Sequence, residues 1–426
     1  MKLLLFPLGI LLAATTAVPR ADAAKITLRH QHFLYAVEGS ADAWAGREEI
    51  WTFDGRPILP APAWNASGAV LPAGVERSER PAWNREAIAA VVREKISTPF
   101  DRPAGAVTIS RASGAVVFDG VGMSGRAVDV ERTVDLLIAA VERGIANITL
   151  PVVETPPQVT VSDPELRAMG IKELVTVGES DYSNSPANRI HNIKVGMAKF
   201  QGHLVPKDAV FSFVGVLGPV DGSTGYKKEL VIKGDKTVPD YGGGLCQISS
   251  TAYRGVWEYG FPILQRRNHS FAVNHYAPQG TDATIYPGAV DMQFKNDGPG
   301  ALLIQTHLDE ERELAYYLYY GTRDDRKSEV VGPYVWGHKP APPERIEYVS
   351  DLPPGQKRKV GEATPGMQTA WFRVLEMGAP AQKIERFHSS YQARPRYFQV
   401  GSAGAASSTH PDAPPVVEEP PSWIGD

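Results

Sequence analysis

The chain has a single cysteine, Cys246, among its 426 residues. One cysteine cannot form an internal disulfide, so covalent cross-links cannot supply the stability of this protein. The chain must fold by burying apolar side chains, and its hydrophobic content of 43% is ordinary for globular domains. At this length we expect two or three such domains.

The first 23 residues have the pattern of an export signal. Lys2 precedes an apolar run, and Ala21, Asp22 and Ala23 form a small-x-small cleavage site. The run is too short to cross a bilayer comfortably, and no other stretch is long and apolar enough. We therefore expect an exported protein of the periplasm, envelope or extracellular space, with no stable membrane span after cleavage. The alternative is an uncleaved anchor.

The charge balance argues against one class of partner. The formal net charge is −4 and the isoelectric point is near 6.2. A general nucleic-acid binder would normally present a basic face and a high isoelectric point. Nucleic acid is therefore not an expected partner.

Hydrophobic periodicity predicts a multi-domain α+β protein with a β-rich end. We divide the chain into a signal peptide at 1–23, a small α+β module at 25–155, a central α+β domain at 170–307, a β module at 341–400 and a tail at 401–426. An extended connection is expected at 156–164. The tail is rich in Pro, Ala and Ser and is expected to be disordered because it cannot build a core.

Two helices are predicted in the first module. Residues 129–144 have Asp129 as N-cap and Gly144 as the stop, with Val134, Leu137, Ile138 and Val141 on one apolar face. Residues 84–100 form the second helix, and its expected inward residues are Ala87, Ala90, Val91 and Ile96. Strands are predicted at 106–110, 115–119, 148–152, 282–286, 290–294, 301–306 and 314–320.

The most informative local stretch is Y-G-G-G-L-C-Q, in which Gly243 and Gly244 precede Cys246 and a marked helix follows. Glycines allow a sharp turn and close approach of a ligand to the backbone. A thiol at a helix N-terminus lies beside unpaired N–H groups and the positive end of the helix dipole, which favours the nucleophilic thiolate. The same N–H groups could hold an oxyanion during acyl transfer.

A cysteine nucleophile usually needs a histidine base. The candidates are His191, His269 and His275, and Asp282 could orient one of them as the third member of a triad. The spacing alone does not choose among these histidines.

Three other interpretations of this region exist. Cys246 could be a buried structural residue, because free cysteine behaves as a small hydrophobe. Glycine-rich turns before helices also bind phosphate, but the Lys-Ser/Thr of a P-loop does not follow here. A zinc site would need tighter ligand spacing than Cys246 and the histidines offer, so no metal and no cofactor are expected.

Several motifs together resemble the VanW-like domain, a bacterial family named after an accessory protein of vancomycin-resistance clusters. They are N-R-I-H-N-I, D-A-V-F-S-F, G-P-V-D-G-S-T-G-Y, Y-G-G-G-L-C-Q-I-S-S-T-A-Y, R-N-H-S and P-Q-G-T-D-A-T, in that order between residues 175 and 306. The stretch F-D-G-V-G-M-S-G-R-A-V-D-V-E-R-T resembles a peptidoglycan-binding module that often precedes this domain. Residues 341–400 are similar to a G5 module, a β-rich adhesion unit.

For some members the resemblance implies L,D-transpeptidase action on peptidoglycan stem peptides. Cys246 would then be the nucleophile, His269 the base, and Asp282 its partner. Residues implied to bind substrate or assist are Arg189, His191, Asn192, Gly243, Gly244, Gln247, Ser249 and Ser270. One departure from the family pattern is S-S-T-A-Y where S-T-T-L-Y is expected.

Two functions follow from these observations. The first is a cysteine acyltransferase of the cell wall, acting as transpeptidase or, with water as acceptor, as carboxypeptidase. The second is a non-enzymatic envelope protein that binds peptidoglycan and keeps Cys246 as a structural residue. The sequence gives neither the oligomeric state nor the acceptor group.

Overall fold

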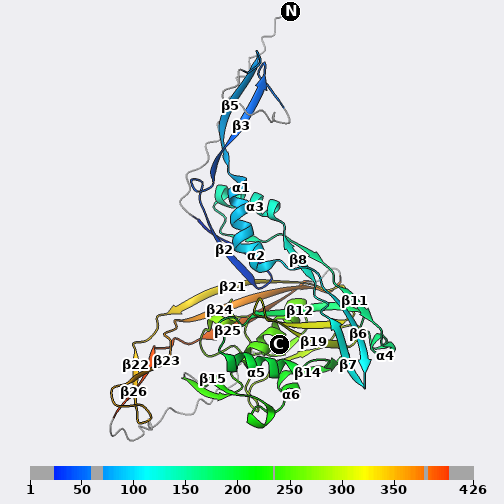
Figure 1. The fold of residues 1–426 in the computed structure, drawn as a ribbon, viewed down its shortest axis with the longest axis vertical. Coiled ribbons are helices and arrows are strands. Elements are labelled where there is room, and N and C mark those ends of the chain that lie inside the picture. Colours follow the sequence, from blue (N-terminus) through cyan, green and yellow to red (C-terminus); the bar gives the residue numbers. More distant parts are fainter. Residues whose placement is uncertain (1–23, 59–70, 234–235, 379–381, 403–426) are drawn as a thin grey trace, which may run out of the picture.

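The computed structural model describes residues 24–58, 71–233, 236–378 and 382–402. The predicted signal peptide and all but the first two residues of the predicted tail lie outside these ranges. In the described part, the protein is a mixed α+β structure of several small sheets, as predicted. Figure 1 shows an elongated shape, with a narrow N-terminal part standing on a broad body.

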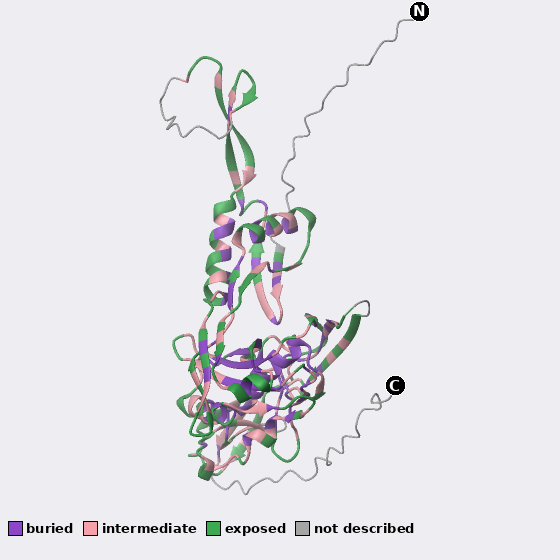
Figure 2. Ribbon diagram, turned by 90° about the vertical axis from the view of Figure 1, so that its right-hand side faces the viewer, coloured by how far each residue is buried: buried purple, intermediate pink, exposed green. Residues whose placement is uncertain are grey.

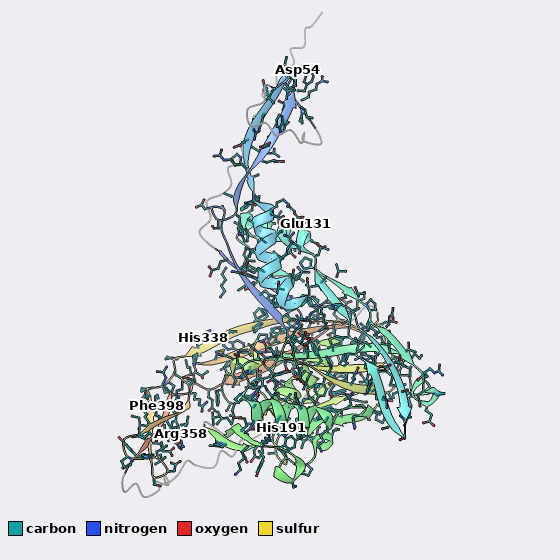
Figure 3. The ribbon with its side chains drawn as sticks, in the orientation of Figure 1. Asp54, Glu131, His191, His338, Arg358 and Phe398 are labelled. Atoms are coloured by element: carbon teal, nitrogen blue, oxygen red, sulfur yellow. The ribbon has the colours of Figure 1, made fainter. Side chains whose placement is uncertain are left out.

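The N-terminal part combines short strands, a helical layer and a projecting arm. Its first sheet has the order β2-β1-β9, and β8 pairs with β10. The strands of these sheets are β1 (Ala24–His30), β2 (Phe33–Gly39), β8 (Gly125–Val128), β9 (Asn147–Thr149) and β10 (Val152–Thr155). The arm contains β3 (Ala45–Phe53), β4 (Arg56–Pro57) and β5 (Val75–Trp83), with Asp54 at its tip in Figure 3.

Both predicted helices of this part form. Helix α3 (Val130–Arg143) begins at the N-cap Asp129, whose side chain accepts from the N–H of Arg132, and ends at left-handed Gly144. Residues 85–100 are helical as α1 (Arg85–Val92), a π-helical turn η1 (Arg93–Ser97) and α2 (Thr98–Phe100).

The inward face predicted for the 84–100 helix is partly wrong. Ala90 is exposed and Ala87 and Val91 are only partly buried, while Ile88, Ala89, Val92 and Ile96 form the buried face. Only Ile96 is buried as predicted, because alanine and branched residues follow one another closely here and the periodicity alone does not fix the phase of the helix.

A three-stranded sheet connects this part to the body. It has the order β11-β6-β7, with strands β6 (Ala106–Ala112), β7 (Ala115–Gly120) and β11 (Gln158–Val161). The predicted hairpin of β6 and β7 is confirmed. The connection expected at 156–164 contains β11, which pairs in parallel with β6, and the strand expected at 148–152 is divided between β9 and β10.

The body is built on a four-stranded sheet with the order β12-β20-β19-β13. Its strands are β12 (Glu173–Asp181), β13 (Leu204–Val205), β19 (Leu302–Asp309) and β20 (Leu314–Gly321). Helices α5 (Ala187–Ala198) and α7 (Leu245–Tyr259) pack against it. The opposite face shares a core with β6, through residues such as Ile109, Leu318 and Tyr320. Figure 2 shows the buried residues concentrated in this body.

The body also contains shorter elements. They are α4 (Pro164–Ala168), β14 (Val210–Ser212), α6 (Phe213–Leu217), η2 (Gly222–Thr224), β15 (Lys228–Lys233), β16 (Lys236–Tyr241), β17 (Ile263–Gln265), η3 (Asn274–Tyr276) and β18 (Gln293–Lys295). The strand expected at 282–286 does not form; only isolated bridges at Thr284 and Tyr286 occur there. The strand expected at 290–294 is the shorter and later β18. The hairpin expected at 301–306 and 314–320 is confirmed as β19 and β20.

The C-terminal part consists of two three-stranded sheets, β21-β24-β25 and β22-β26-β23. The strands are β21 (Lys327–Lys339), β22 (Arg345–Val349), β23 (Lys357–Gly361), β24 (Gly366–Glu376), β25 (Gln382–Tyr391) and β26 (Tyr397–Gly401). The first sheet lies against α7, where Trp371 meets Trp257 edge-on at 5.6 Å. The second sheet forms the far end of the molecule, marked by Arg358 and Phe398 in Figure 3.

Helix α7 is therefore the central element of the body. The apolar face predicted for it is confirmed, since Ile248, Ala252, Tyr253, Val256 and Trp257 are all fully buried. It ends at left-handed Gly260, as expected.

Candidate active site at the start of helix α7

The glycine turn before α7 has a shape that only glycines permit. Gly242 and Gly244 have φ values of 82° and 112°, in the left-handed region that residues with a Cβ avoid. A Cβ on Gly243 would lie 2.8 Å from both the Cβ of Glu229 and the carbonyl oxygen of Leu230. Substitution at any of the three would force the turn to move.

The side chain of Asn192 on α5 holds this turn in place through three hydrogen bonds. Its Nδ2 donates to the carbonyl oxygens of Lys227 and Gly243, both at 3.0 Å, and its Oδ1 accepts from the N–H of Lys227 at 2.8 Å. The side chain is completely buried. Asn192 therefore holds the glycine turn against the β15–β16 hairpin.

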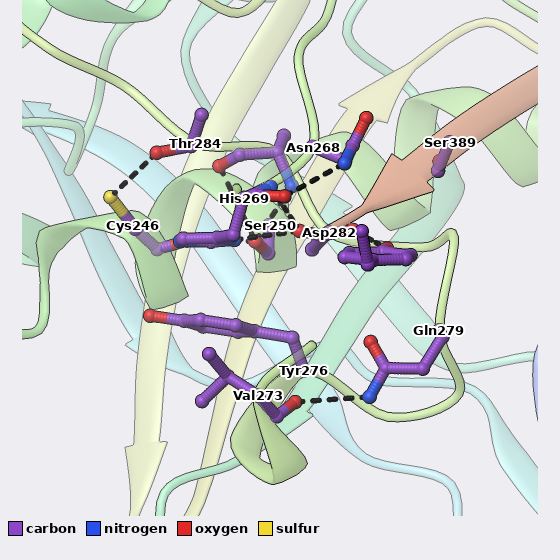
Figure 4. A network of polar contacts seen from close by, with 12 residues as sticks. Cys246, Ser250, Asn268, His269, Val273, Tyr276, Gln279, Asp282, Thr284 and Ser389 are labelled. Carbon is purple, nitrogen blue, oxygen red and sulfur yellow. Dashed lines mark hydrogen bonds and ion pairs between the residues drawn. The ribbon is translucent and has the colours of Figure 1, made fainter. Parts of the chain in front are cut away.

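Cys246 is the second residue of α7 and is partly exposed. Its sulfur lies 3.4 Å from Oγ1 of Thr284 (Figure 4). The thiol also donates to the carbonyl of Ile285 at 3.7 Å. Within the described residues its backbone N–H has no hydrogen-bond partner. The sulfur thus lies at the positive end of the helix dipole, beside a free N–H donor.

His269 and Asp282 form a buried pair beside this thiol. The Nδ1 of His269 lies 2.6 Å from Oδ2 of Asp282, which also accepts from the backbone N–H of His269 at 2.8 Å. The ring stacks on Tyr276 with centroids 4.2 Å apart and planes 9° from parallel. Its other nitrogen, Nε2, is buried without a hydrogen-bond partner among the described residues. Figure 4 shows the ring between Cys246 and Asp282.

The pKa values of the three groups shift in the directions that favour an ion pair. Burial opposes ionisation of Cys246, but the neighbouring His269 outweighs it, so the pKa of the thiol lies below its usual value. Burial likewise opposes charge on His269, but Asp282 and Cys246 raise its pKa to about 9. Although burial works against it, His269 and then Arg266 hold the pKa of Asp282 well below its usual range. Together these shifts favour thiolate, imidazolium and carboxylate at neutral pH.

The second oxygen of Asp282 is held independently of His269. Its Oδ1 accepts from the hydroxyl of Tyr391 at 2.5 Å and from the guanidinium of Arg266 at 3.1 Å. Both carboxylate oxygens are therefore occupied, and the plane of the carboxylate is fixed. This leaves Oδ2 aimed at the imidazole.

Arg254, two turns after Cys246 on α7, anchors the loop that carries Tyr276 and Asp282. Its guanidinium donates to the carbonyl oxygens of Glu179, Tyr276 and Ala277 and to Oγ1 of Thr281, at 3.0 to 3.1 Å. The side chain is only 3% exposed. One buried cation thus ties the nucleophile helix to the loop of its partners.

Arg189 lies near Tyr276. A Cβ on Gly244 would lie 3.0 Å from Cγ of Arg189, so this side chain passes directly beside the turn. Its Nη1 donates to Oγ of Ser185 at 2.5 Å. Burial raises the pKa of Tyr276, as does the Cys246 charge, whereas the nearby Arg189 opposes the rise. A positive charge, a phenol and the thiol are therefore neighbours.

The remaining predicted residues lie around the site rather than in it. The Nε2 of His191 lies 2.9 Å from the carbonyl oxygen of Gly225. Gln247 donates to the carbonyl of Asp181 at 2.6 Å, and Ser249 bonds to the carbonyl oxygens of Cys246 and Ala283. The carbonyl of Ser270 accepts from the N–H of Gln392 at 2.7 Å. His275, the third histidine candidate, lies in η3 next to Tyr276 and is half-buried.

Among the three histidines, His269 is the one whose ring interacts with both Cys246 and Asp282. Sequence reasoning missed Tyr276, Arg254, Arg266, Thr284 and Tyr391. Tyr276 adjoins His275 in the sequence and could have been considered with it. Tyr391 lies 109 residues after Asp282, and no motif connects the two.

Comparison with known proteins covers the same region. Residues 188–319 match the family model described as "VanW like protein". Residues 188–319 form a VanW-like domain. The chain is 32% identical over 163 residues to the uncharacterized protein YoaR of Bacillus subtilis strain 168. The aligned region covers 38% of this chain and 52% of that protein. It is 30% identical over 129 residues to the vancomycin B-type resistance protein VanW of Enterococcus faecalis, covering 29% of this chain and 47% of that protein.

The chain therefore matches about half of the length of each of these relatives. Cys246, His269 and Asp282 all lie inside the VanW-like domain, whereas Tyr391 lies outside it. The peptidoglycan-binding and G5 resemblances of the flanking regions stay predictions. Among the residues with described positions, no helix is long and apolar enough to span a membrane, and no three His, Cys, Asp or Glu side chains cluster as a metal site would require.

Proposed function

We propose that the VanW-like domain is a cysteine acyltransferase that acts on peptidoglycan stem peptides after export to the cell envelope. The observation that carries the proposal is the 2.6 Å contact between His269 Nδ1 and Asp282, beside a thiol at the start of α7. In a triad, the third group fixes the tautomer and orientation of the histidine, which exchanges protons with the nucleophile and leaving group.

In the first half-reaction, the thiolate of Cys246 attacks the carbonyl carbon of the third residue of a donor stem. A tetrahedral oxyanion forms, and the C–N bond to the terminal D-Ala then breaks. The amine leaves with the proton from Nε2 of protonated His269, and a thioester remains on Cys246. The ring nitrogen needed for this transfer is the one without a partner among described residues.

In the second half-reaction, a side-chain amine of another stem attacks the thioester and gives a proton to His269. The C–S bond breaks, the thiolate returns, and a cross-link has formed. With water in place of the amine, the product is a shortened stem. The free N–H of Cys246 is suited to donate to the oxyanion, because it lies in the first turn of the helix.

Arg189 is the candidate for recognising the carboxylate of the departing D-Ala. Guanidinium groups bind carboxylates in paired hydrogen bonds. Arg189 lies beside the glycine turn, next to Tyr276, and so is near the thiol. The name of the enterococcal relative, a vancomycin B-type resistance protein, supports a role in the cell wall.

The test is a Cys246→Ala variant of the exported chain incubated with tetrapeptide muropeptides. Wild type should release D-Ala and form dimers or shortened stems, detected by chromatography and mass spectrometry. The variant should lose at least about 10³-fold of this activity, while its free energy of unfolding changes by less than about 1 kcal/mol because the side chain is partly exposed. Full activity in the variant would refute the proposal.

One observation favours the second candidate, a non-enzymatic peptidoglycan-binding protein. The thiol already donates to the carbonyl of Ile285 and contacts Thr284, so Cys246 has the partners of a structural residue. This function predicts that binding to isolated walls survives both Cys246→Ala and alkylation of the thiol, with no change in muropeptide composition.

A further inference from the structure

Strand β25, 63 to 72 residues beyond the end of the VanW-like match, contacts both loops that carry the buried pair. In the histidine loop, Nδ2 of Asn268 donates to the carbonyl of Ser390 at 2.8 Å. In the aspartate loop, the N–H of Gly280 donates to the hydroxyl of Tyr391 at 2.7 Å. Arg266 joins the two by donating to Oγ of Ser389 at 2.7 Å as well as to Asp282.

Tyr391 is the centre of this contact. Its hydroxyl accepts from Gly280 and donates to Oδ1 of Asp282, so both hydrogen-bonding functions of the hydroxyl are used. The side chain is 3% exposed. Burial and the charge of Asp282 raise the pKa of Tyr391, so the hydroxyl keeps its proton and acts as a donor at neutral pH.

The carboxylate of Asp282 has one torsion that decides where Oδ2 points. Tyr391 and Arg266 both bind Oδ1, and this leaves Oδ2 for Nδ1 of His269. Arg266 is itself fixed from β25 through Ser389. Removal of the tyrosine hydroxyl would leave Oδ1 and the N–H of Gly280 each short of one buried partner.

We propose that Tyr391 is a positioning residue of the site: the C-terminal sheet sets the orientation of Asp282, and through it that of His269 toward Cys246. The C-terminal part is then a component of the active site and not an independent appended module. The inference rests on the proposed function for the catalytic meaning of these three residues, whereas the positioning itself can be measured without substrate.

The neighbouring contacts support a fixed arrangement of this sheet. Nε1 of Trp371 on β24 donates to the carbonyl of Gln279 at 2.9 Å, one residue before Gly280. Arg373 donates to the carbonyl oxygens of Trp257 and Phe261 at the end of α7, at 2.8 and 2.9 Å. The sheet is thus tied to the nucleophile helix and to the aspartate loop at once.

The test compares Tyr391→Phe with Tyr334→Phe, a matched change at a tyrosine of the same sheet that is 53% exposed. The rate of Cys246 alkylation by iodoacetamide is measured from pH 5 to 10 on the intact chain, together with thermal unfolding. In wild type and Tyr334→Phe, the pH at which the alkylation rate is half of its maximum should lie below that of an ordinary thiol, which is about 8.5. This pH is the alkylation midpoint. In Tyr391→Phe it should move upward by about half a unit to one unit, because a displaced imidazolium stabilises the thiolate less.

A second readout separates positioning from folding. With muropeptide substrate, Tyr391→Phe should lower kcat by about 10-fold and leave KM within about twofold, because its hydroxyl is buried and bonded to Asp282 and Gly280. If Tyr391→Phe unfolds at lower temperature but keeps the wild-type alkylation midpoint, the residue is only structural and the inference is wrong. An ordinary midpoint in wild type would overturn it too.

The two proposals fail separately. If Tyr391→Phe shifts the alkylation midpoint but wild type makes no product from muropeptides, the positioning role stands and the proposed reaction fails. If wild type makes the product and Tyr391→Phe changes neither the midpoint nor kcat, the reaction stands and the positioning role fails.

Discussion

The N-terminal and C-terminal parts of the chain both contact the body near α7, but through different chemistry. On the N-terminal side, Arg102 and Arg126 bind the carboxylate of Glu179 at 2.6 and 2.9 Å, and all three side chains are buried. Nearby, His32 contacts Glu258 of α7 at 2.6 Å. The C-terminal side uses Trp371 and a set of neutral and charged hydrogen bonds around Asp282.

The difference lies in what each contact holds. The N-terminal contacts are made to Glu179, which lies in β12, and to Glu258, which lies at the C-terminal end of α7. The C-terminal contacts also reach the end of α7 through Arg373, but unlike the N-terminal ones they hold the loops of His269 and Asp282. We therefore expect damage on the N-terminal side to reduce stability alone, and damage on the C-terminal side to reduce both stability and thiol reactivity.

The largest effect is expected from Trp371→Ala. It removes a fully buried indole between α7 and the aspartate loop and should cost about 4 kcal/mol of unfolding free energy. The alkylation midpoint of Cys246 should rise as well. Trp336→Ala, at an indole of the same sheet that is 36% exposed, is the control and should cost less than about 1 kcal/mol. An unchanged midpoint in Trp371→Ala would contradict the distinction between the two sides.

A slightly smaller loss is expected from Glu179→Ala. Two buried guanidinium groups would lose their common carboxylate, at a cost of about 3 kcal/mol in denaturant unfolding. The alkylation midpoint of Cys246 should stay at its wild-type value. Glu131→Ala breaks an exposed pair with Arg85 and should change stability by less than about 0.5 kcal/mol. A shifted thiol midpoint in Glu179→Ala would show that the N-terminal contacts also shape the site.

The smallest effect is the pH dependence of the unfolding free energy. Its sign is opposite for His32 on the N-terminal side and for His269 on the C-terminal side. Burial lowers the pKa of His32 below 6.5, so its native state favours the neutral ring; that contribution is complete above pH 6.5 and is lost as pH falls. The pKa of His269 is raised to about 9, so its contribution is complete below pH 6.5 and is lost as pH rises through 9.

Unfolding free energies from pH 5 to 9.5 would measure both contributions. The lowered pKa of Cys246 adds stability as pH rises and offsets part of the loss at His269, so we expect the net alkaline decrease to be smaller than the loss at His269 alone. His32→Gln should flatten only the acid side of the profile, and His269→Gln only the alkaline side. If His32→Gln flattened the alkaline side of the stability profile, or His269→Gln the acid side, the assignment of the two histidines would be wrong.

Local rules predicted the elements that obey them. Helix α3 begins at Asp129 and ends at Gly144 because a carboxylate N-cap and a left-handed glycine satisfy the ends of a helix within a few residues. The apolar face of α7 could be predicted because its spacing is helical. The phase of the 84–100 helix and the strand β11 were missed, because they depend on partners distant in the sequence.

The sequence by itself determined the glycine turn, the helix after it, the thiol at its start and a short set of histidines that could serve it. These depend on backbone conformation and spacing, which are properties of neighbouring residues. Only the tertiary structure chose His269 and paired it with Asp282. Only the tertiary structure brought Tyr391 to the same carboxylate. A hydrogen bond such as the one between Asp282 and Tyr391, which are 109 positions apart, arises from the packing of whole strands and leaves no local pattern in the chain.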